Sequence, residues 1–276
     1  MEKQKPGVSR RQMLAVMAVS SIGSMGKRMV FGEGNNRSSY ATSRLVTIDA
    51  KPAPITIDTT QTAVVVIDMQ NDFGSKGGMF DRAGIDISII QRAVEPTAKV
   101  LAAARNANIK IIYLKMAFRA DLSDLGTPDS VTRTRHLQRM HVGKTVTAPD
   151  GSESRILIRD TWNTEILSEL KPKAGDIVLY KHRYSGFFQT DLASILRKLA
   201  VKNLIFTGCT TSVCVDSTIR DATFRDYLPI LLADCTAEPI GYGLARSNHE
   251  ASLLTIEALL GWVSDSEEFV KGLGSA

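Results

Sequence analysis

The seven residues TAVVVID (62–68) form a continuous apolar run that ends in an acidic residue. A strand with one face in water alternates polar and apolar residues, whereas a strand covered on both faces is apolar throughout. TAVVVID therefore predicts a buried strand of a parallel sheet. Further apolar runs follow along the chain, and we predict strands at 109–116, 176–181, 203–208 and 229–234.

Helical stretches separate these strands. We predict helices at 86–107, 161–170, 190–200, 211–226 and 243–260. Pro96 should perturb the first of them. Alternating strands and helices imply a parallel sheet with helices on both faces. Because 276 residues can bury one sizeable core, we expect a single-domain, three-layer α/β fold.

Residues 117–160 break this alternation. They are polar and irregular, and they are too long for an ordinary connection between a strand and a helix. Long insertions of this kind usually serve a binding site or an interface. We therefore expect residues 117–160 to lie at one or the other.

The N-terminal residues differ from the rest of the chain in charge. Residues 1–37 hold seven basic and two acidic residues, which leaves 27 of each sign in the remainder. Within them, VSRRQMLAVMAVSSIGSM (8–25) places Arg10 and Arg11 directly before a short apolar run, and this pattern resembles a twin-arginine export signal. We expect a signal and linker at 1–45, a folded domain at 46–276 and a periplasmic location. The alternative is a cytoplasmic protein with a basic leader.

Charge and cysteine content exclude several classes of partner. The apolar run of the leader is about a dozen residues, short of the ~20 of a stable membrane span. Because the remainder of the chain has no net charge, we expect no nucleic-acid partner. The three cysteines show neither a CxxC pair nor metal-finger spacing, and the histidines are scattered, so we expect no metal and no disulfide scaffold. These residues are Cys209, Cys214, Cys235, His136, His141, His182 and His249.

Three reactive side chains are expected at one edge of the predicted sheet. Asp68 ends the first strand, Lys181 ends the third, and Cys214 opens the helix after the fourth. Parallel sheets bind their ligands at the carboxyl ends of the strands. Each residue alone is more often a strand-end or packing residue, but their joint placement indicates a reactive site.

Together these groups could perform acyl transfer. The helix N-terminus and Lys181 should favour the thiolate of Cys214. Asp68 could take the thiol proton and return it to a leaving amine. Backbone N–H groups around Thr210 and Cys214 could hold the oxyanion. No metal or other cofactor is needed.

Three segments, VVIDMQNDF, YKHRYSGFF and FTGCTTSVCVDSTIRDA, resemble the signature segments of the isochorismatase-like cysteine hydrolases. The resemblance extends over about residues 50–270 and is strongest to the ureidoacrylate amidohydrolases. It implies the isochorismatase-like hydrolase fold, an Asp68, Lys181 and Cys214 triad, and a homo-oligomer. It also implies a cis peptide bond between Cys209 and Thr210, an oxyanion hole formed by the N–H groups of Thr210 and Cys214, and a bystander role for Cys209.

Departures from related sequences narrow the expected chemistry. LKMAFRAD (114–121) has no histidine where nicotinamidases carry a metal cluster, and the presence of Cys214 argues against cleavage of isochorismate. Met116 and Phe118 stand where ureidoacrylate enzymes tend to have Asn and Trp, which argues against ureidoacrylate itself. Residues near the triad could contact the substrate, though packing is an equal alternative for most of them. These are Gln70, Phe73, Phe118, Tyr184 and Phe187.

We therefore predict a thiol-dependent amidohydrolase that cleaves a C–N bond of a small linear amide, ureide or carbamoyl compound through a thioester, with release of ammonia or an amine. One alternative is a non-catalytic protein that binds a small molecule with the same fold. The other is a redox protein that uses Cys209 and Cys214, although their spacing across a strand-to-helix turn fits this poorly.

Overall fold

Six parallel strands form the central sheet, in the order β10-β9-β8-β3-β4-β7. The structure is a computed structural model that describes residues 44–274, all of which belong to one unit, residues 42–276. The strands are β1 (Leu45–Ile48), β2 (Ile55–Asp58), β3 (Thr62–Ile67), β4 (Lys110–Met116), β5 (Thr145–Thr147), β6 (Glu153–Arg155), β7 (Ile177–Lys181), β8 (Asn203–Cys209), β9 (Leu228–Ala237) and β10 (Trp262–Ser264). The α-helices are α2 (Asn71–Gly74), α3 (Met79–Arg82), α4 (Ser88–Gln91), α5 (Val94–Asn106), α6 (Val131–Gln138), α7 (Leu192–Lys198), α8 (Asp216–Thr223), α9 (Asn248–Thr255) and α10 (Ser266–Gly274).

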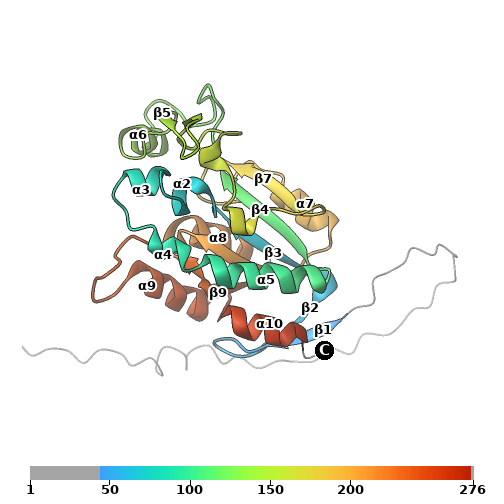
Figure 1. Cartoon of the computed structure of the whole chain (residues 1–276). Helices are drawn as coiled ribbons and strands as arrows, with labels where there is room; N and C mark the ends of the chain where they lie inside the picture. The colour runs from blue at the N-terminus through green and yellow to red at the C-terminus, as the bar shows by residue number, and fades with distance from the viewer. Residues whose placement is uncertain (1–43, 275–276) are drawn as a thin grey trace, which may run out of the picture. The chain divides into compact units, whose positions relative to one another are not determined.

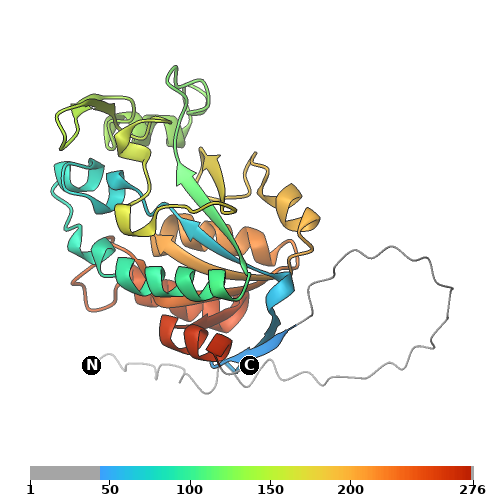
Figure 2. The ribbon, with the colours of Figure 1, turned by 45° about the vertical axis from the view of Figure 1, so that its right-hand side comes forward.

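Helices cover both faces of the sheet, as the apolar run of β3 requires. Val64 and Val66 lie in a core with α5 and α10, and Ala63, Val65 and Ile67 lie in a second core with α7 and α8. Successive residues of a strand point to opposite faces, so every residue of β3 is apolar or small and fully buried. Figure 1 shows α5 and α10 on one face and α8 on the other, and Figure 2 gives the same layers from the side. The predicted three-layer α/β fold is confirmed.

Several element boundaries differ from those predicted. The helix expected at 86–107 is divided into α4 and α5, and α5 holds Pro96 in its first turn, where a missing N–H is tolerated. The helix expected at 161–170 is wrong, because that segment forms two short 3₁₀ turns, η3 (Trp162–Thr164) and η4 (Ser168–Leu170). The helix expected at 211–226 begins with a π-helical turn, η5 (Thr211–Val215).

The end of the sheet also holds elements that the periodicity does not reveal. The helix expected at 243–260 is shorter and consists of α9 followed by a π-helical turn, η6 (Ile256–Leu260). β10 extends the sheet beyond β9, and α10 packs beside α5. The strands β1 and β2 form an antiparallel pair outside the central sheet.

The strand order places the chain reversal of the sheet at β3. From β3 the chain continues to β4 on one side, and β8 lies on the other side of β3. Such switch points open a crevice at the carboxyl ends of parallel strands, and ligands bind there. Asp68 follows β3 directly and Cys214 lies in the helical turn after β8, so two of the three reactive residues lie at this switch point.

The insertion at 117–160 lies beyond the carboxyl ends of β4 and β7 (Figure 1). It contains α6 and a hairpin of β5 and β6 rather than wholly irregular structure. The buried Asp72 ties the segment that follows the hairpin to α2 and α3, because its carboxylate accepts from the N–H of Leu157 at 2.7 Å, the N–H of Met79 at 2.9 Å and the amide of Asn163. Burial raises the pKa of Asp72 to about 6, and these donors oppose that rise.

The predicted export signal and linker at 1–45 lie outside the described residues, except for Arg44 and Leu45. Within residues 44–274, none of the helices has the length and apolar character that a membrane crossing requires.

Replacement of Asp72 by alanine should destabilise the fold. The change leaves three donors unpaired in a buried place, and each unpaired buried donor costs roughly 1–3 kcal/mol. We expect Asp72→Ala to lower the free energy of unfolding by about 3 kcal/mol, measured by urea denaturation at pH 7. Asp129→Ala, at an exposed position, is the matched control. Equal unfolding free energies for the two variants would contradict this account of how the insertion is held.

Candidate active site

Asp68 lies at the carboxyl end of β3 and is almost completely buried, with 1% of its surface exposed. Its backbone takes a left-handed conformation, with φ at 54°, which Asp adopts more readily than most residues. Its Oδ1 accepts from the backbone N–H of Met116 at 2.8 Å, and its Oδ2 lies 2.7 Å from Nζ of Lys181. The carboxylate is thus held by β4 and β7 together.

Lys181 is the last residue of β7, and its side chain is fully buried. Its ammonium group also lies 3.6 Å from Sδ of Met116 and 3.4 Å from the carbonyl oxygen of Arg183. Burial by itself lowers the pKa of Lys181, but the charges of Asp68 and Cys214 reverse this and leave the pKa raised. Burial raises the pKa of Asp68, and Lys181 opposes that rise. The two groups therefore form a buried ion pair in which the carboxylate is a stronger base than usual.

Cys214 lies within η5, directly after β8, and only 7% of it is exposed. Its side chain interacts with the carboxylate of Asp68 and with the ammonium group of Lys181. Burial raises the pKa of the Cys214 thiol, and Lys181 only partly offsets this. The expectation that the surroundings of Cys214 would favour the thiolate is therefore wrong, because burial outweighs the charge of Lys181 and leaves the pKa of the thiol raised. The thiol keeps its proton until a base removes it.

The turn between β8 and η5 brings Cys214 close to Asp68. Gly208 has φ at 119°, and a Cβ there would lie 1.9 Å from the carbonyl oxygen of Ile67, so this position requires glycine. The peptide bond between Cys209 and Thr210 is cis, as the family resemblance implies. Cys209 is fully buried, and its thiol donates to the carbonyl oxygen of Asp68 at 3.2 Å.

A buried acid that was not predicted holds the start of η5. Glu238 follows β9 and is 2% exposed. Its carboxylate accepts from the N–H of Ser212 at 2.8 Å, from the Ser212 hydroxyl group, and from the N–H of Ile240 at 2.9 Å. Thr211 also shares a hydrogen bond of 3.0 Å with Nδ1 of His249. These contacts fix Thr211 and Ser212, two of the three residues between Thr210 and Cys214, and no sequence spacing indicates them.

The predicted substrate contacts fall into two groups. Phe118 and Tyr184 both pack against His136 of the insertion. Burial raises the pKa of Tyr184, and the charges of Cys214 and Lys181 also act on it. The other predicted contacts are engaged elsewhere. Gln70 is fully buried and binds the backbone N–H and carbonyl groups of Met116, while Phe73 packs edge-on against Phe80 and Phe187 stacks with Tyr227.

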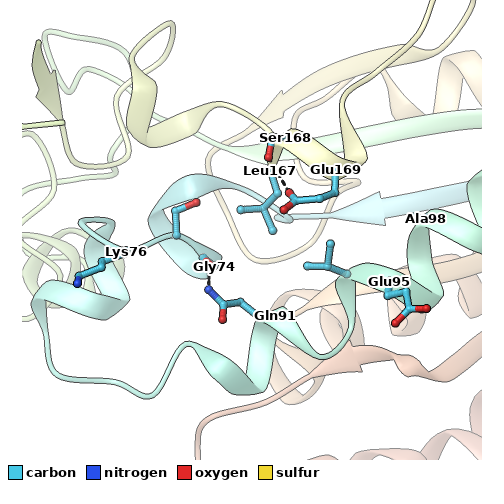
Figure 3. Close-up of a pocket in the computed structure, with 10 residues that line it drawn as sticks. Gly74, Lys76, Gln91, Glu95, Ala98, Leu167, Ser168 and Glu169 are labelled. Carbon is cyan, nitrogen blue, oxygen red and sulfur yellow. Dashed lines mark hydrogen bonds between the residues drawn. The ribbon is translucent and has the colours of Figure 1, made fainter. Parts of the chain in front are cut away.

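One cavity lies away from the triad. It measures about 690 Å³ and lies between α2, α5 and the turn at 167–169. Figure 3 shows its wall, where Gln91 donates to the carbonyl oxygen of Gly74 and Ser168 to Glu169. Among residues 44–274, no group of three His, Cys, Asp or Glu side chains is placed to hold a metal ion, and all three cysteines are free.

Comparisons with known proteins agree with this geometry. Residues 62–268 match the model of the isochorismatase domain. The chain is 39% identical to the ureidoacrylate amidohydrolase RutB of Methylorubrum extorquens over 230 residues, which cover 83% of this chain and 90% of that protein. It is 38% identical to the protein of the same name from Klebsiella variicola, over 84% of this chain and 95% of that protein.

Solved structures show the same fold. A cysteine hydrolase from Pseudomonas syringae pv. phaseolicola superimposes with a TM-score of 0.65 and 30% identity, over 85% of this chain and 99% of the other. An N-carbamoylsarcosine amidase from Thermoplasma acidophilum superimposes with a TM-score of 0.54 and 24% identity, over 75% and 97% of the two chains. The domain match spans most of the chain and includes all three triad positions, so this protein belongs to the isochorismatase family.

Proposed function

We propose that this protein hydrolyses a C–N amide bond of a small linear ureide or carbamoyl compound, with Cys214 as nucleophile, Asp68 as general base and acid, and Lys181 as their cationic partner. The observation that carries the proposal is the buried contact of one thiol with one carboxylate–ammonium pair at the switch point of the sheet. The relatives named as ureidoacrylate amidohydrolases support hydrolysis of an amide by a cysteine hydrolase.

The first half-reaction forms a thioester. Asp68 takes the proton of the Cys214 thiol, and the sulfur attacks the substrate carbonyl carbon, whose π electrons move to oxygen. The N–H groups of Thr210 and Cys214 stabilise the oxyanion. When the C–N bond breaks, Asp68 returns its proton to the leaving nitrogen, and ammonia or an amine departs.

The second half-reaction regenerates the thiol. Water replaces the amine, and Asp68 takes a proton from it as the oxygen attacks the thioester carbon. Collapse of this second tetrahedral intermediate breaks the C–S bond and releases the acid, and Asp68 then returns the proton to the sulfur. Lys181 remains protonated throughout, because the charges beside it raise its pKa. Its positive charge compensates the negative charge of the carboxylate and of each developing anion in the buried site.

The raised pKa values favour this sequence over a preformed thiolate. Because burial raises the pKa of both Asp68 and Cys214, the carboxylate is a better proton acceptor and the neutral thiol is the resting form. Among the predicted contacts, Phe118 and Tyr184 are best placed to line the substrate site. We expect the active form to be a homo-oligomer. A non-catalytic binding protein, the alternative function, would have no need of the buried ion pair beside a thiol.

Ammonia release from a substrate panel should depend on Cys214. The panel is biuret, ureidoacrylate, N-carbamoyl amino acids, nicotinamide and maleamate, assayed with a chelator present. We expect Cys214→Ala to lose at least 10³-fold in kcat, because no other nucleophile can form the thioester. Cys235→Ala, which removes a buried thiol on β9, should retain turnover. Equal ammonia release by wild type and Cys214→Ala would rule out Cys214, and loss of activity in Cys209→Ser would favour the redox alternative.

The pH dependence of kcat/KM should report Asp68. Below its pKa Asp68 is protonated and cannot act as base, and burial places that pKa above the ordinary value of 3.8. We expect kcat/KM to fall toward acid with a midpoint above pH 3.8 and to stay level through pH 9, because the pKa of Cys214 lies above its ordinary value of 9.0. The residual activity of Asp68→Asn should lack the acid limb. A rise centred at pH 8–9 would instead indicate a titrating thiolate.

We further propose that residues 1–45 direct export through the twin-arginine route and that residues 46–276 form the hydrolase domain. Arg10 and Arg11 before a short apolar run support this. Fractionation of a bacterial host should find the wild-type protein in the periplasm. The double variant Arg10→Lys/Arg11→Lys should stay in the cytoplasm, because the route recognises the arginine pair. Periplasmic accumulation of the double variant would contradict the proposal.

A further inference from the structure

His136 is a fully buried imidazole with one unpaired nitrogen. It lies on α6 within the insertion, and its Nδ1 is 2.6 Å from the carbonyl oxygen of Thr132, one turn earlier. A carbonyl oxygen can only accept, so Nδ1 carries the proton and Nε2 of the neutral ring presents a lone pair. Nε2 is buried and has no hydrogen-bond partner. Because buried polar atoms are nearly always paired, this atom indicates a missing donor.

The ring of His136 borders the proposed site. It packs edge-on against Phe118, with centroids 5.3 Å apart, and stacks with Tyr184 at 5.9 Å. These two residues follow β4 and β7, at the sheet edge that carries the triad. Nδ1 faces the backbone of α6, so Nε2 lies on the opposite edge of the ring, away from that helix.

Burial and the neighbouring positive charges favour the neutral form of His136. Burial lowers its pKa first, and the positive charges of Arg183 and Lys181 lower it further, while the contact with Thr132 opposes them. Neither cation completes the hydrogen bonding of Nε2. Lys181 is paired with Asp68, and the guanidinium group of Arg183 donates to the carbonyl oxygens of Asp124 and His182.

We infer that Nε2 of His136 accepts a hydrogen bond from a substrate N–H and thereby selects ureido compounds. This inference rests on the proposed function. The leaving nitrogen must lie at Asp68, which supplies its proton, so in this inference His136 contacts the nitrogen on the other side of the carbonyl carbon. In a compound R–NH–CO–NH₂, that nitrogen carries one hydrogen. It carries none when a second alkyl group replaces this hydrogen.

The preference can be measured as binding, without turnover. N-carbamoylglycine and N-carbamoylsarcosine differ only by a methyl group on this nitrogen. In the full-length Cys214→Ala protein, calorimetry should show N-carbamoylglycine bound about tenfold more tightly, the usual effect of one hydrogen bond between neutral groups. Equal binding of the two ligands, or no binding of either, would overturn the inference.

Variants of His136 separate recognition from packing. His136→Phe in the same background keeps a ring between Phe118 and Tyr184 but has no acceptor, so it should bind the two ligands within twofold of each other. His136→Gln restores an acceptor and should recover the preference. This variant also tests the inference if His136→Phe fails to fold. The exposed His141 of the same segment provides the control, His141→Asn, which should bind like its parent.

Each outcome assigns the failure to one proposal. Equal loss of affinity for both ligands in His136→Phe would show that the ring acts through packing. A preference that persists in His136→Phe would show that another group recognises the nitrogen. Either result overturns the inference. Turnover of the amide panel by wild-type protein would leave the proposed hydrolase activity standing in those cases. In wild-type turnover, recognition in the ground state should place the difference between the two ligands in KM rather than kcat.

Discussion

The ion pair of Asp68 and Lys181 is the interaction on which the site depends. It joins the ends of β3 and β7 across β4, and both charged groups are removed from water. A buried pair of this kind adds little net stability, but loss of either partner leaves an uncompensated charge that costs roughly 3–5 kcal/mol. The pair therefore constrains the protonation state of the site, because Asp68 can lose its charge at low cost only if another group beside Lys181 becomes negative.

That constraint determines how the thiol reacts. In an exposed helix terminus the N–H groups and a nearby ammonium group would lower the pKa of a cysteine. Here the ammonium charge is already engaged by a carboxylate, and burial of Cys214 raises its pKa. Proton transfer to Asp68 costs less than release of a proton to water, because the charge that leaves the carboxylate reappears on sulfur beside the same ammonium group. In the proposed mechanism, the nucleophile is thus generated within the triad when a substrate is present.

The backbone of the sheet could be predicted from the sequence, and the walls of the site could not. Apolar runs such as TAVVVID report burial on both faces, and strand ends of a parallel sheet meet at one edge, so the positions of Asp68, Lys181 and Cys214 follow. Glu238 and His136 act through contacts between segments far apart in the chain, with η5 and with Phe118 and Tyr184 respectively. Periodicity carries no information about such contacts. The helix predicted at 161–170 is wrong for the same reason, because Asn163 binds the distant Asp72 instead of a helical neighbour.

The insertion is held in place by hydrogen bonds to Asp72, and it also contains a buried acceptor without a hydrogen-bond partner. Three donors converge on Asp72, one from α3 and two from residues 157–163 after the β5–β6 hairpin, so the Asp72 carboxylate holds the base of the segment. At its other end His136 is equally buried, but its Nε2 is not paired. Under the proposed function, a segment that is held at its attachment and presents an unpaired acceptor beside Phe118 and Tyr184 has the properties expected of a substrate wall. The fold holds the imidazole in place beforehand, so ligand binding need not order it, and the donor that the protein lacks is the one that a ureido nitrogen can supply.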